Sequence, residues 1–452
     1  MSVTWFAPLF LWLFVWACRG ERQWVAATVI ATFFQAASPI LLVGAGRNIG
    51  MQPAYLLLPV GLTQFFMHVF RPRTEFATRF RLNGSHLFML GLTVIAVVGA
   101  FMLPRVFGGL VHVLSPRGAT RIVLHGSSGN MIQAMYVISN FVLFALVAAA
   151  VHRGAVTASQ CIRYLAIGTT MAAGLGIYQV VCNFAHLPWP DMVINSNLGV
   201  AQEFNQTAFG SARRMSSTFL EPSMFAMHFL GMFALFALGM HARKIGTVVL
   251  LCLLVSTSGT AYAGLLALTG VWIAFHIGRH GLGMGTAVSL CLAASLIVAV
   301  LIAMSFGYHD LSGSNYVSQK LSSSSGQLRI REDMLALQTF VESWGLGVGV
   351  GSTRASSLIT TFLASTGILG LVCLFGFFGS LIFQALAADV REVRALGLAL
   401  TALFVGWLIS VPDLAMPMIW TICGIISGSL SRVAQRTPQF QDLPQTPILR
   451  VV

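Results

Sequence analysis

The run HLFMLGLTVIAVVGAFML, residues 86–103, decides the fold class that the sequence predicts. It contains no Asp, Glu, Lys or Arg, and an α-helix needs about 20 mostly apolar residues to cross the hydrocarbon core of a bilayer. The run therefore predicts a transmembrane helix. Comparable runs recur along the chain and place further candidate spans near residues 3–18, 24–46, 52–70, 130–151, 161–183, 223–241, 245–258, 260–278, 284–307, 358–387, 395–413 and 415–431.

The overall composition agrees with a chain built from such runs. Of its 452 residues 56% are hydrophobic and only 9% charged, whereas an ordinary soluble domain carries roughly 25% charged residues. This excludes a conventional globular enzyme and a disordered chain. The cysteines lie mostly within apolar runs without paired spacing, which indicates small buried side chains rather than a disulfide scaffold or a zinc site. The sequence predicts an all-α polytopic membrane protein with about 12–13 transmembrane helices.

The net charge of +13 is distributed in a way that predicts membrane topology. The basic residues are scattered in short loops between apolar runs, which is typical of membrane proteins and not of a nucleic-acid-binding face, so no nucleic-acid partner is expected. The strongest cytoplasmic marker is the loop from Arg71 to Arg81, with four arginines and one glutamate. Placing it in the cytoplasm leaves the N-terminus outside, the C-terminus inside and two larger loops on the outer side.

These assignments divide the chain into six segments. They are N-terminal transmembrane helices 1–183, a first large outer loop 184–222, central helices 223–307, a second large outer loop 308–357, C-terminal helices 358–432 and a cytoplasmic tail 433–452. Residues 104–129 are amphipathic and rich in glycine and serine, and we expect a surface helix and a turn there.

The apolar runs contain almost no acidic residue or arginine. A proton- or ion-coupled transporter normally binds its cargo through ionisable groups near the middle of the bilayer. Their scarcity argues against a transporter, whereas a flippase with a water-filled groove stays an alternative. The histidines in or near the spans are expected to be interfacial or hydrogen-bonded; they are His68, His86, His228 and His276.

The first outer loop ends in the stretch ARRMSSTFLEPSMFA, residues 212–226, where two arginines, a hydroxyl cluster and a carboxylate precede a span. Pro222 suits the first turn of that helix, and Glu221 lies beside the positive end of its dipole. Two interpretations remain open. Either Glu221 is a helix cap and Arg213 and Arg214 are interfacial anchors, or these side chains form a site.

The second outer loop predicts an amphipathic helix followed by a glycine-rich segment. The segment SWGLGVGVGSTRASS, residues 343–357, has alternate glycines, which allow positive φ and close backbone approach. It predicts either a nest of N–H groups that binds an anion, with Arg354 behind it, or a tight re-entry into the membrane. The helix before it is expected to place Leu328, Met334, Leu335 and Phe340 on its apolar side and Arg329, Arg331, Glu332, Asp333 and Glu342 on its polar side.

Together these motifs resemble the O-antigen polymerase/O-antigen ligase family. The resemblance lies in the stretch from Arg214 to Pro222 that opens a span, in the outer segment from Arg331 to Ser352, and in the following sequence LASTGILG. The turn from Ser256 to Tyr262 is a fainter match. The resemblance covers residues 160–430.

The resemblance implies a glycosyltransferase in the bacterial inner (cytoplasmic) membrane, with its active site and both large loops facing the periplasm. Such enzymes act on undecaprenyl-diphosphate-linked oligosaccharides and use no nucleotide sugar. The implied function is metal-independent, inverting polymerisation of repeat units into a surface polysaccharide, which includes O-antigen, capsule and exopolysaccharide. The implied partners are the lipid bilayer, a chain-length regulator and a flippase.

One departure from the family pattern bears on the reaction. The ligase branch places a His-Asn pair shortly before the glycine that matches Gly367, and the corresponding positions here are Ser356 and Ser357. This favours a polymerase. The alternatives are an O-antigen ligase that transfers glycan to lipid A-core and, from another class, a lipid-linked glycan flippase or exporter.

Glycan transfer from a lipid diphosphate requires a group that stabilises the negative charge of the departing diphosphate and a base that accepts the proton of the acceptor hydroxyl. Arginine suits the first, because its guanidinium binds phosphate oxygens bidentately and stays charged. We expect Glu221 as base or acceptor-orienting group, with Glu332 and Asp333 as alternatives, and Arg214 and Arg354 as its catalytic partners. No carboxylate or histidine cluster has metal-ligand spacing, so we expect no metal and no other cofactor. Substrate binding is expected from Arg213, Arg329, Arg331, Ser352 and Ser356.

Overall fold

The computed structural model describes residues 2–44, 47–70, 84–114, 120–197, 214–280, 324–410 and 413–436. Helices make up most of these ranges, and two small antiparallel sheets supply the remaining regular structure. The fold class is therefore confirmed as an all-α membrane protein. The predicted span 284–307, the basic loop from Arg71 to Arg81 and the candidate residue Arg213 lie outside the described residues.

Six helices in the described ranges are long and apolar enough to cross a membrane. Each coincides with a predicted span, so the chain is a multi-pass membrane protein. The six are α5 (Gly84–Val106), α6 (Ser128–Arg153), α7 (Ala158–Ala185), α9 (Pro222–Phe233) continued by the π-helical turn η1 (Ala234–Gly239), α15 (Leu358–Ala387) and α16 (Arg391–Ile409).

The other predicted spans coincide with helices of varied length. Those at 3–18, 24–46, 52–70 and 245–258 contain helices of only 11 to 13 residues. The remaining helices are α1 (Ala7–Ala17), α2 (Glu21–Ala31), α3 (Pro53–Leu56), α4 (Leu58–Val69), α8 (Asp191–Ile194), α10 (Arg243–Val255), α11 (Gly259–His280), α14 (Ser324–Glu342) and α17 (Pro417–Arg436).

The prediction of one continuous span at 24–46 is wrong. Helix α2 ends at Ala31, and the chain continues through an irregular segment into β2 (Ile40–Gly44), which pairs antiparallel with β1 (Ser2–Val3) and β3 (Arg47–Gly50). Pro39 disfavours helical geometry in the residue before it. The irregular backbone finds partners elsewhere, since the Ala36 N–H donates to Thr218 O at 3.0 Å.

Two further predictions also need correction. The span 52–70 is interrupted at Leu57, whose carbonyl accepts a hydrogen bond from the Trp24 indole at 2.8 Å. In the segment 104–129, a hairpin of β4 (His112–Leu114) and β5 (Arg121–Val123) replaces the expected surface helix. The hairpin is held by α14, because Thr339 Oγ1 donates to His112 O at 2.9 Å.

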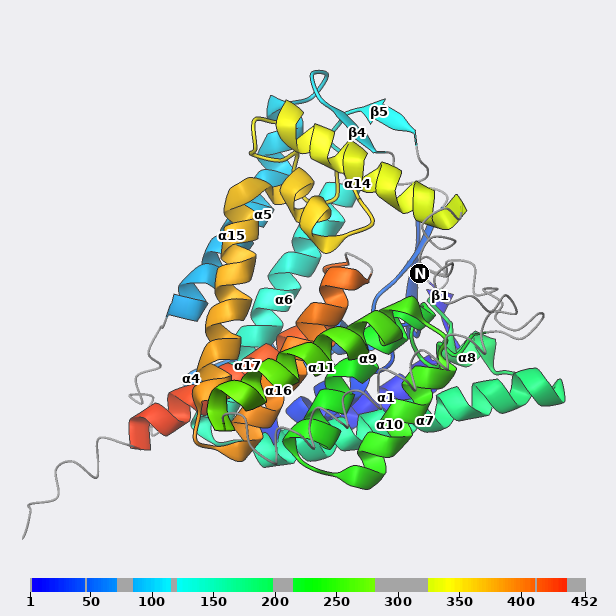
Figure 1. Ribbon diagram of the computed structural model, residues 1–452, viewed down its shortest axis with the longest axis vertical. Coiled ribbons are helices and arrows are strands. Elements are labelled where there is room, and N and C mark those ends of the chain that lie inside the picture. The colour runs from blue at the N-terminus through cyan, green and yellow to red at the C-terminus, as the bar shows by residue number, and fades with distance from the viewer. Residues whose placement is uncertain are drawn as a thin grey trace, which may run out of the picture.

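Small residues allow the central helices to pack closely. Helices α5, α6 and α15 run beside one another in Figure 1, and α17 crosses against α6. A Cβ atom at Gly428 of α17 would lie 2.4 Å from Ala148 O of α6, so the two backbones are in direct contact, as is typical of membrane helices. Buried aromatic rings fill the space between α15, α16 and α17, among them Phe377, Phe378, Trp407 and Trp420.

Of the four histidines singled out in the sequence, His86 and His228 are hydrogen-bonded, as expected, and His68 lies beside an acid. His86 Nε2 lies 2.9 Å from Ser427 Oγ, and His68 Nε2 lies 3.5 Å from Glu21. His228 is buried and bonds through both ring nitrogens. The side chain of His276 lies outside the described residues.

Candidate functional site

Residues 214–221 form a mostly buried, non-helical segment that leads into α9. The side chain of Gln179, from α7, holds its backbone: Oε1 accepts hydrogen bonds from the N–H groups of Ser216 and Ser217, both at 2.9 Å. Within a bilayer, irregular backbone is tolerated only where it is buried in protein or lines a water-filled cavity. Gln179 therefore satisfies donors that would otherwise be costly to bury.

The same segment is tied to the irregular chain after α2. Thr218 Oγ1 donates to Phe33 O at 2.5 Å, and the Ala36 N–H donates back to Thr218 O at 3.0 Å. Ser217, which has a positive φ of 53°, donates through Oγ to Ala172 O of α7 at 2.6 Å. The irregular segment after α2 and the segment before α9 thus satisfy each other's polar groups and fix the position where α9 begins.

Arg214 is half-buried and bound to the turn between α10 and α11. Its Nε donates to Thr257 Oγ1 at 3.2 Å, and its Nη2 donates to Thr257 O at 2.7 Å. Thr257 has a φ of +47°, which is uncommon for a β-branched residue and costs backbone strain. The structure therefore brings together the Arg214 motif and the turn from Ser256 to Tyr262, two stretches that the sequence analysis singled out separately.

Glu221 occupies the N-cap position of α9, with Pro222 at the first helical position as expected. Its carboxylate makes no capping hydrogen bond to the backbone; Oε2 instead accepts one from Ser223 Oγ at 2.9 Å. None of the ion pairs in the described ranges involves it. The half-buried carboxylate thus lies at the positive end of a helix without serving as its cap.

Helix α14 has the expected position, but the expected division into an apolar and a polar side is not observed, because Leu335 and Phe340 are half-buried together with Glu332 and Asp333. Ile330, Met334, Leu337 and Val341, spaced as one helical stripe, are exposed. The acidic side packs instead against the start of α15, with Glu332 accepting a hydrogen bond from Ser356 Oγ.

Asp333 caps α15. Its Oδ1 accepts hydrogen bonds from the N–H groups of Ser356 at 3.0 Å and Ser357 at 2.9 Å, and from Thr360 Oγ1 at 2.7 Å. A carboxylate suits this position, because the first N–H groups of a helix lack partners within the helix and carry positive partial charge. Asp333 and Glu332 are therefore engaged in holding the fold, and Glu221 is the better candidate for the base.

We expect Asp333→Ala to lower the free energy of unfolding by about 1–3 kcal/mol, because three donors at the start of α15 lose their acceptor. The measurement is thermal or denaturant unfolding of the purified protein in detergent. Arg331→Ala, at an exposed neighbouring position, serves as the matched control and should have little effect. Equal stability of the Asp333 variant and wild type would contradict the capping role.

The glycine-rich segment packs tightly against neighbouring helices. Gly345, Gly347, Gly349 and Gly351 all have positive φ, between 77° and 89°. The N–H groups of Gly345, Gly347 and Gly349 bond within the protein; for example, Gly349 N donates to Ser365 O at 2.8 Å. A Cβ atom at Gly351 would lie 2.4 Å from Gly129 O. The glycines therefore allow backbone contact with α5, α6 and α15.

The two serines predicted to bind substrate are engaged inside the protein. Ser352 is buried, donates through Oγ to Val348 O at 2.8 Å and accepts from Asn130 Nδ2 at 2.7 Å. Ser356 Oγ donates to Glu332. In this structure both hydroxyls position the glycine-rich segment and the start of α15.

The remaining predicted arginines, Arg329, Arg331 and Arg354, are exposed. None of the ion pairs in the described ranges involves them. Arg329 and Arg331 belong to α14, at the top of Figure 1, and Arg354 lies two residues before Ser356, which bonds to Glu332 of that helix; α9 and α10 lie lower in that view. The candidate residues thus form two groups: a half-buried one, Arg214 with Glu221, and an exposed one, these three arginines.

Glu342 fastens the end of α14 to the β4–β5 hairpin. Its Oε1 lies 2.7 Å from Arg121 Nη2, and its Oε2 accepts from the His112 N–H at 3.1 Å. Burial acts to raise the pKa of this carboxyl, but the hydrogen bonds from Arg121 and His112 outweigh it and hold the pKa below its ordinary value. The ionised form is therefore favoured in the folded protein.

This lowered pKa predicts a pH dependence. A carboxyl whose pKa is depressed by folding stabilises the protein fully above its unfolded pKa of about 4.3, and the contribution is lost as the pH falls through the folded value. Glu342→Gln should therefore unfold at a lower temperature than wild type at pH 7, and the difference should shrink under acid conditions. A difference that stays constant through the acid range would contradict the assignment.

Sequence reasoning missed the carboxamides that organise the site. Gln35 and Gln179 lie within apolar runs, and both are buried against the 214–228 region. Gln35 Nε2 lies 2.7 Å from His228 Nε2, while His228 Nδ1 lies 2.7 Å from Met224 O. Because a carbonyl only accepts, Nδ1 carries the proton and Gln35 donates to Nε2. The sequence signal that could have identified Gln35 and Gln179 is the presence of an uncharged polar residue in the middle of an apolar run.

Within the described ranges, no group of three or more histidine, cysteine, aspartate or glutamate side chains is placed to hold a metal ion. A scan against protein-family models and a search of curated proteins find no match to this chain.

Proposed function

We propose that this chain is an integral-membrane glycosyltransferase that polymerises undecaprenyl-diphosphate-linked repeat units into a surface polysaccharide. The observation that carries the proposal is that a half-buried guanidinium and a half-buried carboxylate, those of Arg214 and Glu221, belong to one hydrogen-bonded segment that leads into a membrane span. The proposal includes about 12–13 spans, two larger periplasmic loops and a location in the bacterial inner membrane.

The chemistry requires that a negative leaving group departs while a hydroxyl loses its proton. Arg214 supplies a permanent positive charge, which is oriented by its bonds to Thr257 before substrate arrives. A donor that is already in place stabilises developing charge without reorganisation. Arg214 is therefore assigned to the diphosphate of the lipid carrier.

Glu221 is assigned to the acceptor. The hydroxyl of the acceptor sugar attacks the anomeric carbon of the donor, its proton passes to the Glu221 carboxylate, and the bond to the lipid diphosphate breaks with inversion of configuration. A general base needs to lie within hydrogen-bond reach of the hydroxyl and to be ionised. Glu221 lies at the N-terminal end of α9, where the helix dipole suits a carboxylate side chain.

The exposed arginines are assigned to binding rather than to the chemical step. Arg354, Arg329 and Arg331 surround α14 with positive charge, which suits phosphate or acidic sugar groups of the incoming lipid-linked glycan. Arg213, next to Arg214 in the sequence, is assigned the same role. The proposed reaction requires no metal, because the guanidinium groups of the arginines neutralise the charge of the diphosphate.

Deletion of the gene tests the proposal and separates it from its alternatives. A polymerase predicts single repeat units on the lipid carrier or on the final acceptor, without longer chains. Full-length polymer stranded on undecaprenyl diphosphate would contradict this and indicate a ligase. Repeat units trapped on the cytoplasmic face would contradict both transferases and indicate a flippase.

A further inference from the structure

A pocket lies where three membrane-spanning segments end or begin. It is formed by the end of η1 and the turn after it, by the end of α15 and by the start of α16, and it has a volume of about 200 Å³. Because the ends of spans mark the boundary of the bilayer, this pocket lies at the level of the lipid headgroups. Its lining residues are Leu238, Gly239, His241, Leu386, Arg391, Arg394, Ala395 and Leu398.

The backbone of η1 is shaped to form this pocket. The π-helical turn ends with Met240 N donating to Leu235 O at 2.8 Å, and His241 follows with a φ of +52°. A Cβ atom at Gly239 would lie 2.5 Å from the Ala395 Cβ, so only glycine lets α16 approach this closely. π-helical turns are rare and occur frequently at functional sites.

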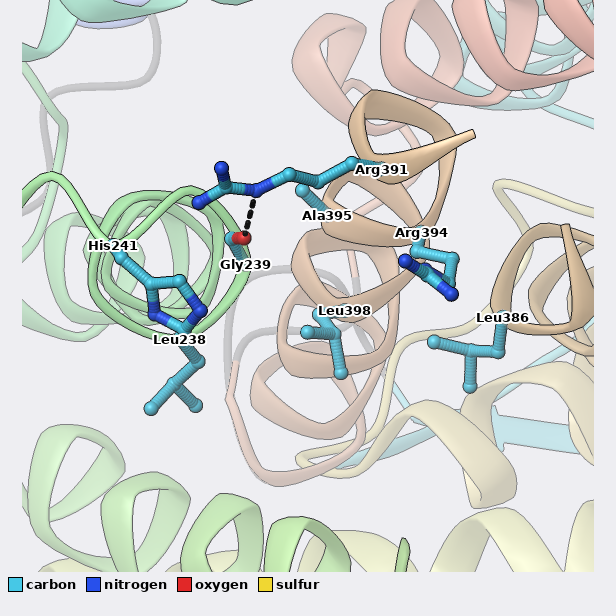
Figure 2. A pocket seen from close by; sticks show the side chains of 8 residues that line it. All are labelled: Leu238, Gly239, His241, Leu386, Arg391, Arg394, Ala395 and Leu398. Atoms are coloured by element: carbon cyan, nitrogen blue, oxygen red, sulfur yellow. Dashed lines mark hydrogen bonds between the residues drawn. The ribbon is translucent and has the colours of Figure 1, made fainter. Parts of the chain in front are cut away.

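Two arginines from the first turn of α16 provide the charge. Arg391 donates through Nε to Gly239 O at 3.3 Å and through Nη2 to Met240 O at 2.7 Å, which fixes its guanidinium at the rim, as Figure 2 shows for the first bond. Arg394 is half-buried and also lines the pocket; in Figure 2 its guanidinium points toward Leu386, whereas that of Arg391 points toward Gly239. None of the ion pairs in the described ranges involves either of them.

The lining combines this charge with an apolar surface. No acidic residue lines the pocket, and Leu238, Leu386 and Leu398 form its apolar part. A small inorganic anion would need the arginines alone, whereas a lipid would place its phosphate on the arginines and its glycerol and upper acyl chain on the leucines. Basic pockets between transmembrane helices are typical binding places for anionic headgroups. The pocket is smaller than the roughly 300–1,000 Å³ of pockets that enclose drug-sized ligands. It therefore suits a headgroup phosphate and the adjoining part of a lipid rather than a whole ligand.

We propose that this pocket binds the phosphate headgroup of an anionic membrane phospholipid. The headgroup phosphate contacts Arg394, Arg391 adds positive charge at the rim, and the leucines contact the apolar part of the same lipid. Bound lipid fastens the ends of η1, α15 and α16 together at the membrane boundary. This site is separate from Arg214 and Glu221, so the inference does not rest on the glycosyltransferase proposal.

The test uses the full chain in phosphatidylcholine nanodiscs and a fluorescent phosphatidylglycerol as the probe. Arg394→Gln removes one charge from the pocket without removing a side-chain bond that the described structure contains. We expect it to weaken phosphatidylglycerol binding about fivefold to tenfold, the effect of one basic residue at an anionic headgroup. Arg394→Lys should retain part of the affinity. Arg243→Gln is the matched control, because Arg243 is exposed nearby but does not line the pocket.

Three outcomes decide the proposal. Weaker binding by the Arg394→Gln variant with unchanged binding by the Arg243→Gln variant supports it. Equal weakening by both variants overturns it, because general attraction by a basic surface then explains the lipid binding. Displacement of the lipid by inorganic phosphate at similar concentration also overturns it, because the pocket would then select a free phosphate.

Discussion

Replacement of Arg214 with alanine is expected to lower glycan transfer about 100-fold to 1,000-fold, the usual cost of removing one preorganised group that stabilises developing negative charge. Arg214 is held before substrate binds, because its guanidinium donates to both the carbonyl and the hydroxyl of Thr257. Arg214→Lys should recover only part of the activity, since an ammonium group cannot form the same two-pronged contact. The measurement is polymer output normalised to the amount of protein in the membrane.

A structural role of Arg214 must be separated from a catalytic one, because the residue also fastens the α10–α11 turn. Thr257→Val removes the hydroxyl acceptor but keeps the carbonyl acceptor, and it leaves the guanidinium in place. We expect this variant to lose less than about tenfold, the equivalent of one net hydrogen bond. If Arg214→Ala retains full polymer output at normal protein levels, the site assignment is wrong. If Thr257→Val loses as much as Arg214→Ala, the arginine acts through the turn.

Gly367→Ala is expected to destabilise the protein by about 2–5 kcal/mol, the sum of left-handed backbone strain and overpacking. Gly367 interrupts α15 with a φ of +68°, and a Cβ atom there would lie 2.4 Å from Gly345 O and 2.6 Å from the carbonyl carbon of Leu346. These are backbone atoms of the glycine-rich segment, which cannot rotate away as a flexible side chain could.

Gly109→Ala is the matched control for this prediction. Gly109 also has a positive φ, +80°, but a Cβ atom there meets nothing within 4 Å. It should therefore show the strain alone, about 1–2 kcal/mol. Unfolding of both variants in the same detergent measures the difference. Equal losses would mean that the contact between α15 and the glycine-rich segment does not limit stability.

The sequence predicted long apolar helices well and interrupted ones poorly. The span at 358–387 matches α15 at both ends, because one continuous apolar run dominates every other signal there. The run at 24–46 is similarly apolar, but its second half is a strand and an irregular segment whose backbone bonds to residues near 196 and 218. A high hydropathy indicates that a segment is buried. A helix and a loop can both be buried, provided that the backbone polar groups of the loop bond to residues distant in the sequence.

The residues proposed for the site stood out in the sequence, whereas the contacts that hold them did not. Arg214 and Glu221 stood out as charges at the mouth of a span, yet their supports, Gln179 and Thr257, are distant in the sequence. The apolar and polar sides expected for α14 followed from residue types alone. Asp333 and Glu332 turn inward here because the start of α15 needs acceptors.

The most direct measurement of the proposed activity uses the purified chain in nanodiscs with a synthetic undecaprenyl-diphosphate-linked repeat unit, a metal chelator and no nucleotide sugar. A glycosyltransferase of the proposed kind converts the repeat unit into a ladder of longer lipid-linked chains, and Arg214→Ala and Glu221→Gln each suppress the ladder while the protein stays folded. A ladder of unchanged intensity from both variants, or no ladder from the folded wild-type protein with the repeat unit of its own polysaccharide, would contradict the proposed function.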